Sequence, residues 1–163
     1  MKIYILIPSF CLALLLTGCG TMIAGNLKAT NDNWDIDIVA IKDGPNSVSQ
    51  VPYLTTMPRP GFRFIWLTIQ AKNNSNVARM IDLRKIGLIS GQILVLPFHV
   101  VRDTWLNIPA NNELTLDPNE SARRRIVFMF PINIQPQVIR VPDIGDIPVE
   151  LLPSIKTDRV GPE

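Results

Sequence analysis

Few residues in this chain are of the types that carry out catalysis or bind metals. His99 is the single histidine among 163 residues, so a metal site built from several histidines is excluded. A serine hydrolase of the Gly-x-Ser-x-Gly kind is not indicated, because the chain has no such motif. His99 follows Pro97-Phe98 at the end of an expected strand. We interpret it as a surface or hydrogen-bonding residue, and we expect no catalytic residue.

Three aspartates lie close together, at Asp32, Asp35 and Asp37. Asp35 and Asp37 would share one face of a strand, because alternate residues of a strand point to the same side. Carboxylates bind Ca²⁺, but the Asp-x-Asp-x-Asp-Gly loop with a distal glutamate is absent. A glycosidase needs two carboxylates that flank a sugar-sized cleft, and the sequence marks no cleft. We therefore expect a solvated strand face, no metal site and no cofactor.

The run Arg123-Arg124-Arg125 is a candidate for partner binding. On a strand, Arg123 and Arg125 would point outward, with Val127 and Met129, while Ile126, Phe128 and Phe130 face the core. Such a stripe could contact lipid headgroups or an acidic protein surface. The alternative is a solvated strand edge whose charges prevent edge-to-edge pairing.

Phe64 and Trp66 are the second candidates for partner binding. If Ile65 and Leu67 face the core, the two aromatic rings face outward, where exposed aromatic side chains can anchor a partner. The alternative is that the proline-rich stretch 52–60 covers them.

The N-terminal segment has the features of a secretion signal. The cation Lys2 is followed by an apolar stretch over residues 5–16, which Pro8 interrupts and which is short for a membrane span. We expect residues 1–18 to be a signal peptide that is removed.

The signal ends in Leu16-Thr17-Gly18-Cys19, which resembles the lipobox of bacterial lipoproteins. The small residues Thr17 and Gly18 let a signal peptidase approach the backbone closely, and Cys19 would then receive the lipid. The resemblance implies several acyl chains on Cys19, which together anchor a protein firmly to a bilayer. Gly20 stands where an aspartate would signal retention in the inner membrane, so we expect the outer membrane in an organism that has one. An ordinary signal peptide or an uncleaved anchor is the alternative.

Composition limits the class of partner. The chain has 16 basic and 14 acidic residues, and removal of the signal, with Lys2, leaves 15 − 14 = +1. A near-neutral domain without a basic stripe does not indicate nucleic-acid binding. The charged fraction is only 18%, so contact with a protein or a membrane surface is plausible. The mature chain has no cysteine besides Cys19 and hence no disulfide.

The remaining chain predicts one all-β domain. We expect a lipidated tether at 19–31, an antiparallel β-sandwich at 32–156 and a flexible tail at 157–163, because short strand patterns alternate with turn signals. The expected strands are 34–39, 62–72, 80–90, 92–96, 122–130, 138–141 and 147–152.

Three segments together resemble a group of uncharacterised bacterial lipoproteins with an immunoglobulin-like domain, akin to the secreted immunoprotective antigen of mycobacteria. They are a Trp-Asp-Ile-Asp-Ile strand at 34–38, a strand ending in Asn73-Asn74-Ser75, and a Leu-x-Pro-x-Glu turn at 116–120 before a strand that closes at Phe128-Met129-Phe130-Pro131. The resemblance implies an immunoglobulin-like sandwich and no particular activity.

Our leading hypothesis is a lipid-anchored binding or assembly module of the cell envelope, attached to the membrane through Cys19 and partnered by an envelope protein. Two alternatives stay open. One is a carrier of a small apolar ligand in a cavity lined by Trp34, Phe128 and Phe130. The other is an envelope hydrolase, for which a serine and an aspartate would have to converge on His99, or an inhibitor of a hydrolase.

Overall fold

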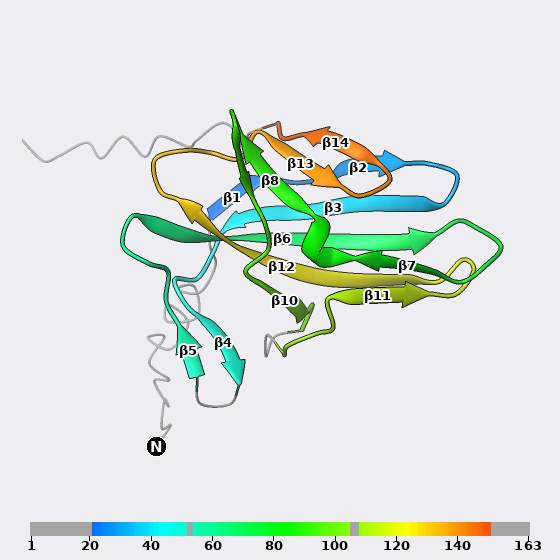
Figure 1. The fold of residues 1–163 in the computed structure, drawn as a ribbon, viewed down its shortest axis with the longest axis horizontal. Helices are drawn as coiled ribbons and strands as arrows, with labels where there is room; N and C mark the ends of the chain where they lie inside the picture. Colours follow the sequence, from blue (N-terminus) through cyan, green and yellow to red (C-terminus); the bar gives the residue numbers. More distant parts are fainter. Residues whose placement is uncertain (1–20, 52–53, 105–107, 151–163) are drawn as a thin grey trace, which may run out of the picture.

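The structure is a computed structural model that describes residues 21–51, 54–104 and 108–150. Within these ranges the chain forms fourteen β-strands, one short 3-10 helix and no α-helix. All strand pairs are antiparallel, and the sheets stack as two layers (Figure 1). The predicted all-β antiparallel sandwich is confirmed. The signal at 1–18, Cys19, and the tail at 157–163 lie outside the described residues.

The first layer is a six-stranded sheet in which β1 and β2 both lie beside β3. Its order is β1-β3-β6-β12-β10, with β2 paired to another part of β3. The strands are β1 (Thr21–Ala24), β2 (Leu27–Thr30), β3 (Trp34–Asp43), β6 (Phe62–Asn73), β10 (His99–Arg102) and β12 (Ser121–Pro131).

The predicted tether at 19–31 is wrong for residues 21–30, because β1 and β2 bind the edge of β3 there. Their strand character is hidden in the sequence, since each is only four residues long and buries few side chains. The sheet therefore begins at Thr21, only two residues after Cys19.

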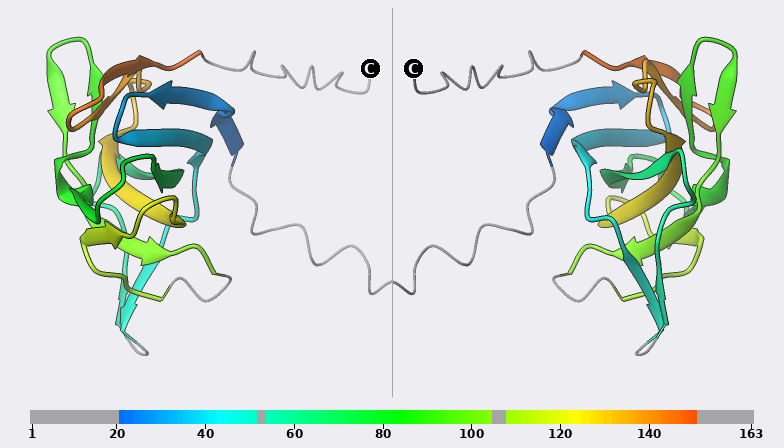
Figure 2. Two further views of the ribbon diagram at one scale, coloured as in Figure 1. Left: turned by 90° about the vertical axis from the view of Figure 1, so that its right-hand side faces the viewer. Right: turned by 90° about the vertical axis from the view of Figure 1, so that its left-hand side faces the viewer.

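The second layer consists of a four-stranded sheet, β14-β13-β8-β9, and the pair β11-β7. Its strands are β7 (Arg79–Asp82), β8 (Gly87–Ser90), β9 (Ile93–Val95), β11 (Glu113–Leu116), β13 (Val138–Val141) and β14 (Gly145–Pro148). A hairpin of β4 (Val48–Val51) and β5 (Leu54–Thr56) projects from the sandwich, as both end views show (Figure 2).

The strand predicted at 80–90 is two strands with a 3-10 turn, η1 (Leu83–Lys85), between them. The side chain of Asp82 accepts a hydrogen bond from the backbone N–H of Arg84 at 3.1 Å. This local bond competes with the ladder and ends β7 at Asp82.

The main core lies between the layers and follows the two-residue period of β3, β6 and β12. Its buried side chains come from both layers and include Trp34, Ile36, Ile38, Leu67, Ile69, Leu88, Phe128, Phe130 and Ile139. No helix in the described part of the chain is long and apolar enough to cross a membrane.

Candidate functional site

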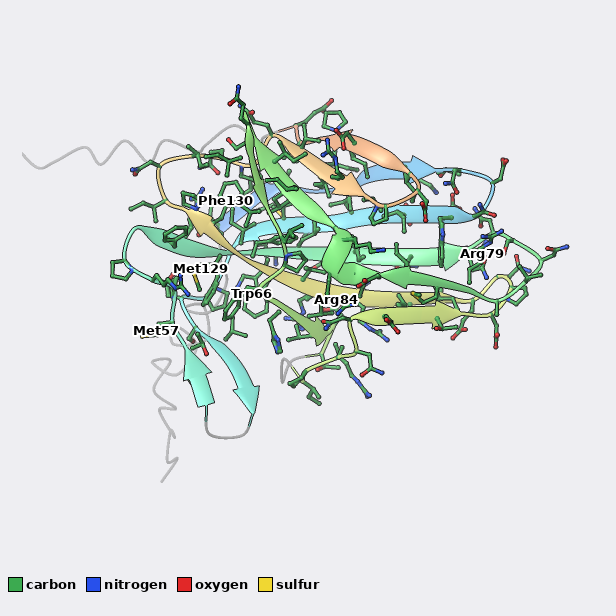
Figure 3. All side chains as sticks on the ribbon, viewed as in Figure 1. Met57, Trp66, Arg79, Arg84, Met129 and Phe130 are labelled. Atoms are coloured by element: carbon green, nitrogen blue, oxygen red, sulfur yellow. The ribbon has the colours of Figure 1, made fainter. Side chains whose placement is uncertain are left out.

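Phe64 and Trp66 are buried, so their predicted role as exposed anchors is wrong. Both point away from the main core, as their position in β6 requires, but they form a second cluster with Val48, Val101 and Val127. Phe64 is fully buried, and Trp66 is 4% exposed. Trp66 and Met129 lie close together above the start of the β4–β5 hairpin (Figure 3).

The cover over these aromatics comes from two segments. Val48 of β4 lies on one side, and the ring of Phe98 stacks on Phe64 with 5.5 Å between the ring centroids. Gly44 allows the close approach of Trp66, because a Cβ at position 44 would overlap the indole ring. The prediction of a covering segment was closer to the structure than that of an exposed face, although the described cover is not the stretch 52–60.

Arg123 and Arg125 lie side by side on the outer face of β12, but they do not form a free cationic stripe. Nε of Arg125 lies 2.8 Å from Oδ1 of Asp103, and this side chain is only 22% exposed. Nη1 of Arg123 lies 3.7 Å from the second oxygen of Asp103, and its Nη2 donates to Oε1 of Gln70 at 3.0 Å. The predicted attraction for an anionic surface is thus reduced by Asp103.

The middle arginine of the run occupies a different surface. Arg124 shares the inward side of β12 with Ile126, and it lies directly opposite Arg102 of β10 in the register. The two side chains line an open groove of about 350 Å³, together with Asn111, Glu113, Thr115 and other residues of the 109–115 segment.

No carboxylate among the described residues lies within ion-pair distance of Arg102 or Arg124. Burial, with a smaller effect of the charge on Arg102, lowers the pKa of Arg124. Nε of Arg124 is buried without a hydrogen-bond partner in the described structure. Two like charges on neighbouring strands repel each other, and an anionic group in the groove would relieve that repulsion.

The pair Arg102–Arg124 was not predicted, although the sequence contains one indication of it. Arg124 has the same strand parity as Ile126, Phe128 and Phe130, so a charged residue stood at an inward position. The pairing with Arg102 depends on the register between β10 and β12, which the sequence did not reveal.

The remaining candidates show no catalytic or metal-binding arrangement. His99 is half-buried, burial lowers its pKa, and its Nε2 has no hydrogen-bond partner in the described structure. Thr30 donates to Asp35 and lowers the pKa of that carboxyl, and Asp37 faces Lys28 at 3.7 Å. The described residues contain no group of three His, Cys, Asp or Glu that could hold a metal ion.

The two turn motifs of the family resemblance meet at one buried side chain. Asn73 is fully buried, and its Nδ2 donates to the carbonyls of Val77 at 2.8 Å and Leu116 at 3.0 Å. Its Oδ1 accepts from the backbone N–H of Ser75, while its own N–H donates to the carbonyl of Glu120. These motifs therefore hold the two turns together.

Comparison with known proteins shows the fold alone. No protein-family model and no curated protein matches the chain. A conserved hypothetical protein from Bacillus anthracis is 13% identical, with a TM-score of 0.60 over 81% of this chain and 98% of that one. An uncharacterised β-sandwich protein from Clostridium difficile is 15% identical, with a TM-score of 0.49 over 78% of this chain and 91% of that one. The chain is therefore similar in architecture to the conserved hypothetical protein from Bacillus anthracis.

Proposed function

We propose that this chain is a lipid-anchored protein of the cell envelope whose β-sandwich is a binding or assembly module without catalysis. The observation that supports the proposal is a spacing: the lipobox ends at Cys19, and the folded sheet begins at Thr21. A folded domain that begins two residues after Cys19 supports the proposal that a lipid on Cys19 would hold the domain close to the membrane. The kinship with immunoglobulin-like lipoproteins and the mycobacterial antigen belongs to the same proposal, as does an outer-membrane location.

The groove between Arg102 and Arg124 is the surface that we assign to the partner. Charge-assisted hydrogen bonds to guanidinium groups are strong and directional. Glu113 also lines the groove, but the ion pair of its carboxylate within the described residues is with Arg84, at 3.8 Å, and not with Arg102 or Arg124. An acidic side chain of an envelope protein would fit this groove. Arg123 and Arg125, which already share Asp103, have less charge to offer.

The two alternatives have less support. A carrier would need a cavity beside Trp34, Phe128 and Phe130, but all three are at most 3% exposed within the packed core, and neither described groove is lined by them. A hydrolase would need a serine and an aspartate at His99.

The anchor is tested by labelling cells with radioactive palmitate. The wild-type chain should incorporate the label and partition into detergent, and Cys19→Ala should lose both properties. Equal labelling of the two chains would refute the anchor at Cys19.

The binding surface is tested by crosslinking in intact cells followed by purification. We expect Arg124→Gln to lose a partner that the wild-type protein captures, because the groove loses one of its two cations. Arg140→Gln is the matched control, since Arg140 is exposed on β13 and already paired with Asp146 at 2.7 Å. Identical capture by all three proteins would exclude the groove as the binding surface.

A further inference from the structure

One end of the sandwich has a compact surface of exposed apolar residues. We call it the apolar tip and define it as residues 57–62 and 131–133. Met57 is 67% exposed, Phe62 40% and Ile132 51%. Met57 lies at the end of the molecule opposite Arg79 (Figure 3).

Hydrogen bonds hold the apolar tip in a defined shape. The N–H of Phe62 donates to the carbonyl of Arg59 at 3.0 Å, and Gly61 has a φ of +82°, which a type II turn requires after Pro60. The N–H of Ile132 donates to the carbonyl of Gly61 at 3.1 Å and joins the two loops. The apolar side chains are therefore presented by a fixed backbone.

The chain enters the sandwich from the same end. Because β1 and β6 are both antiparallel to β3, they run in the same direction, and the beginning of β1 lies toward the beginning of β6. Thr21 is level with Asp43 and Ile65, so Phe62 extends three residues further, which is about 10 Å along the strand.

The distance between anchor and sheet is short. Two residues span at most about 7 Å of extended chain, so a lipid on Cys19 would hold Thr21 within that distance of its attachment point. The apolar tip extends beyond Thr21 on the same side. It is consequently the surface that a bilayer would meet first.

The end that would face the bilayer is less acidic than the opposite end. The apolar tip contains no acidic residue and one exposed cation, Arg59. Beside it, Asp43 is neutralised by Arg63, with 2.6 Å between Nη1 and Oδ2. The turns at the opposite end are joined by hydrogen bonds and have four exposed carboxylates, those of Asp32, Asp117, Glu120 and Asp143, which outnumber the exposed cation Arg79 there.

We infer that the apolar tip is a second membrane contact, which inserts among the phospholipid headgroups next to the lipid on Cys19. This inference rests on the proposed anchor. Apolar side chains beside a cation bind the headgroup boundary, and a lipid chain and a protein surface reinforce each other as membrane signals. The acidic turns then face away from the negatively charged headgroups. The groove of Arg102 and Arg124 would be displayed at a fixed height above the bilayer.

The experiment uses the full chain, processed in cells and purified into vesicles of phosphatidylethanolamine and phosphatidylglycerol. A mature lipidated protein has no free thiol, so Phe62→Cys or Ile132→Cys introduces a single site for an environment-sensitive fluorophore. Val77→Cys is the matched control, because Val77 is apolar, 52% exposed and in the turn that follows β6 at the opposite end. Quenching by nitroxide-labelled lipids reports contact with the bilayer.

We expect probes at positions 62 and 132 to be quenched several-fold more than the probe at position 77, with emission shifted to the blue. Equal, weak quenching at all three positions in a palmitate-labelled protein would overturn the membrane contact while leaving the anchor intact. Absence of palmitate from the wild-type chain would overturn both. If Phe62→Cys does not fold, Ile132→Cys and Met57→Cys give the same comparison.

Discussion

Removal of the Asn73 side chain tests whether the buried turn network stabilises the sandwich. Asn73→Ala removes two bonds donated by Nδ2 and the bonds that Oδ1 accepts from Ser75. It also leaves the buried carbonyl of Leu116 without this donor. At about 1 kcal/mol for each lost bond, and more for a buried group left unsatisfied, we expect a loss of about 3–5 kcal/mol.

The loss is measured by urea unfolding of the purified protein. With a slope of about 1–3 kcal/mol per molar urea, the unfolding midpoint should fall by about 2 M. Asn76→Ala is the matched control, because Asn76 is exposed in the same turn. If Asn73→Ala lowers the midpoint no more than Asn76→Ala does, the network does not hold the turns together.

The isosteric change Asn73→Asp separates hydrogen bonding from packing. A carboxylate at this position would face the carbonyl oxygens of Val77 and Leu116, so its folded-state pKa should lie above the unfolded value of about 4. A raised folded pKa means that the folded state favours the protonated carboxyl. The variant should therefore be least stable near neutral pH and regain stability as the pH falls through that raised pKa. Equal destabilisation at every pH would show that shape alone matters.

Further predictions concern the second cluster and the titrating groups. Trp66→Ala should lose about 3–5 kcal/mol of stability through the cavity it leaves, and an unchanged thermal midpoint would contradict its burial. Gly44→Ala should lower the thermal midpoint and alter the near-ultraviolet circular dichroism, because its Cβ would overlap the indole of Trp66. Burial lowers the pKa of His99 below 6.5, so stability should fall as the pH drops through 6.5 toward the folded pKa, and His99→Gln should abolish this fall in urea titrations. A side-chain hydrogen bond from Arg140, aided by its charge, lowers the pKa of Asp146; its stabilisation is present above about pH 4 and lost as the pH falls through the folded pKa. NMR titration of Arg140→Gln should show the carboxyl of Asp146 returning toward its ordinary pKa.

The long central strands could be predicted because their pattern is local. β3 alternates apolar and acidic residues from Trp34 to Ile38, β12 has an unbroken apolar run from Ile126 to Phe130, and turn residues mark the ends of both strands. β1, β2, β10 and β11 are four residues long. β1, β10 and β11 pair with strands that are not their neighbours in the sequence, and β2 forms a short hairpin with β3. No local pattern of that length distinguishes a strand from a loop.

The error at Phe64 and Trp66 has a physical cause. Four consecutive apolar residues, 64–67, indicate a strand covered on both faces, whereas the interpretation assumed that only one face was covered. The covering residues Val48 and Phe98 come from segments before and after β6. The position of these residues over β6 depends on tertiary structure, which the sequence pattern does not reveal. The same is true of the groove formed by Arg102 and Arg124.

The way β1 is attached to the sheet has a mechanical consequence for a protein held by its N-terminus. If the proposed lipid on Cys19 and a partner on the sandwich pulled against each other, the force would enter the fold through β1, which has only three register pairs with β3 and a bulge among them. β2 follows with four pairs. Peeling of residues 21–30 would release about 33 Å of chain at roughly 3.3 Å per residue, while β3, β6 and β12 stay paired. Under such tension, local unfolding of the first two strands would lengthen the link between the lipid and the domain while the rest of the sandwich stays folded.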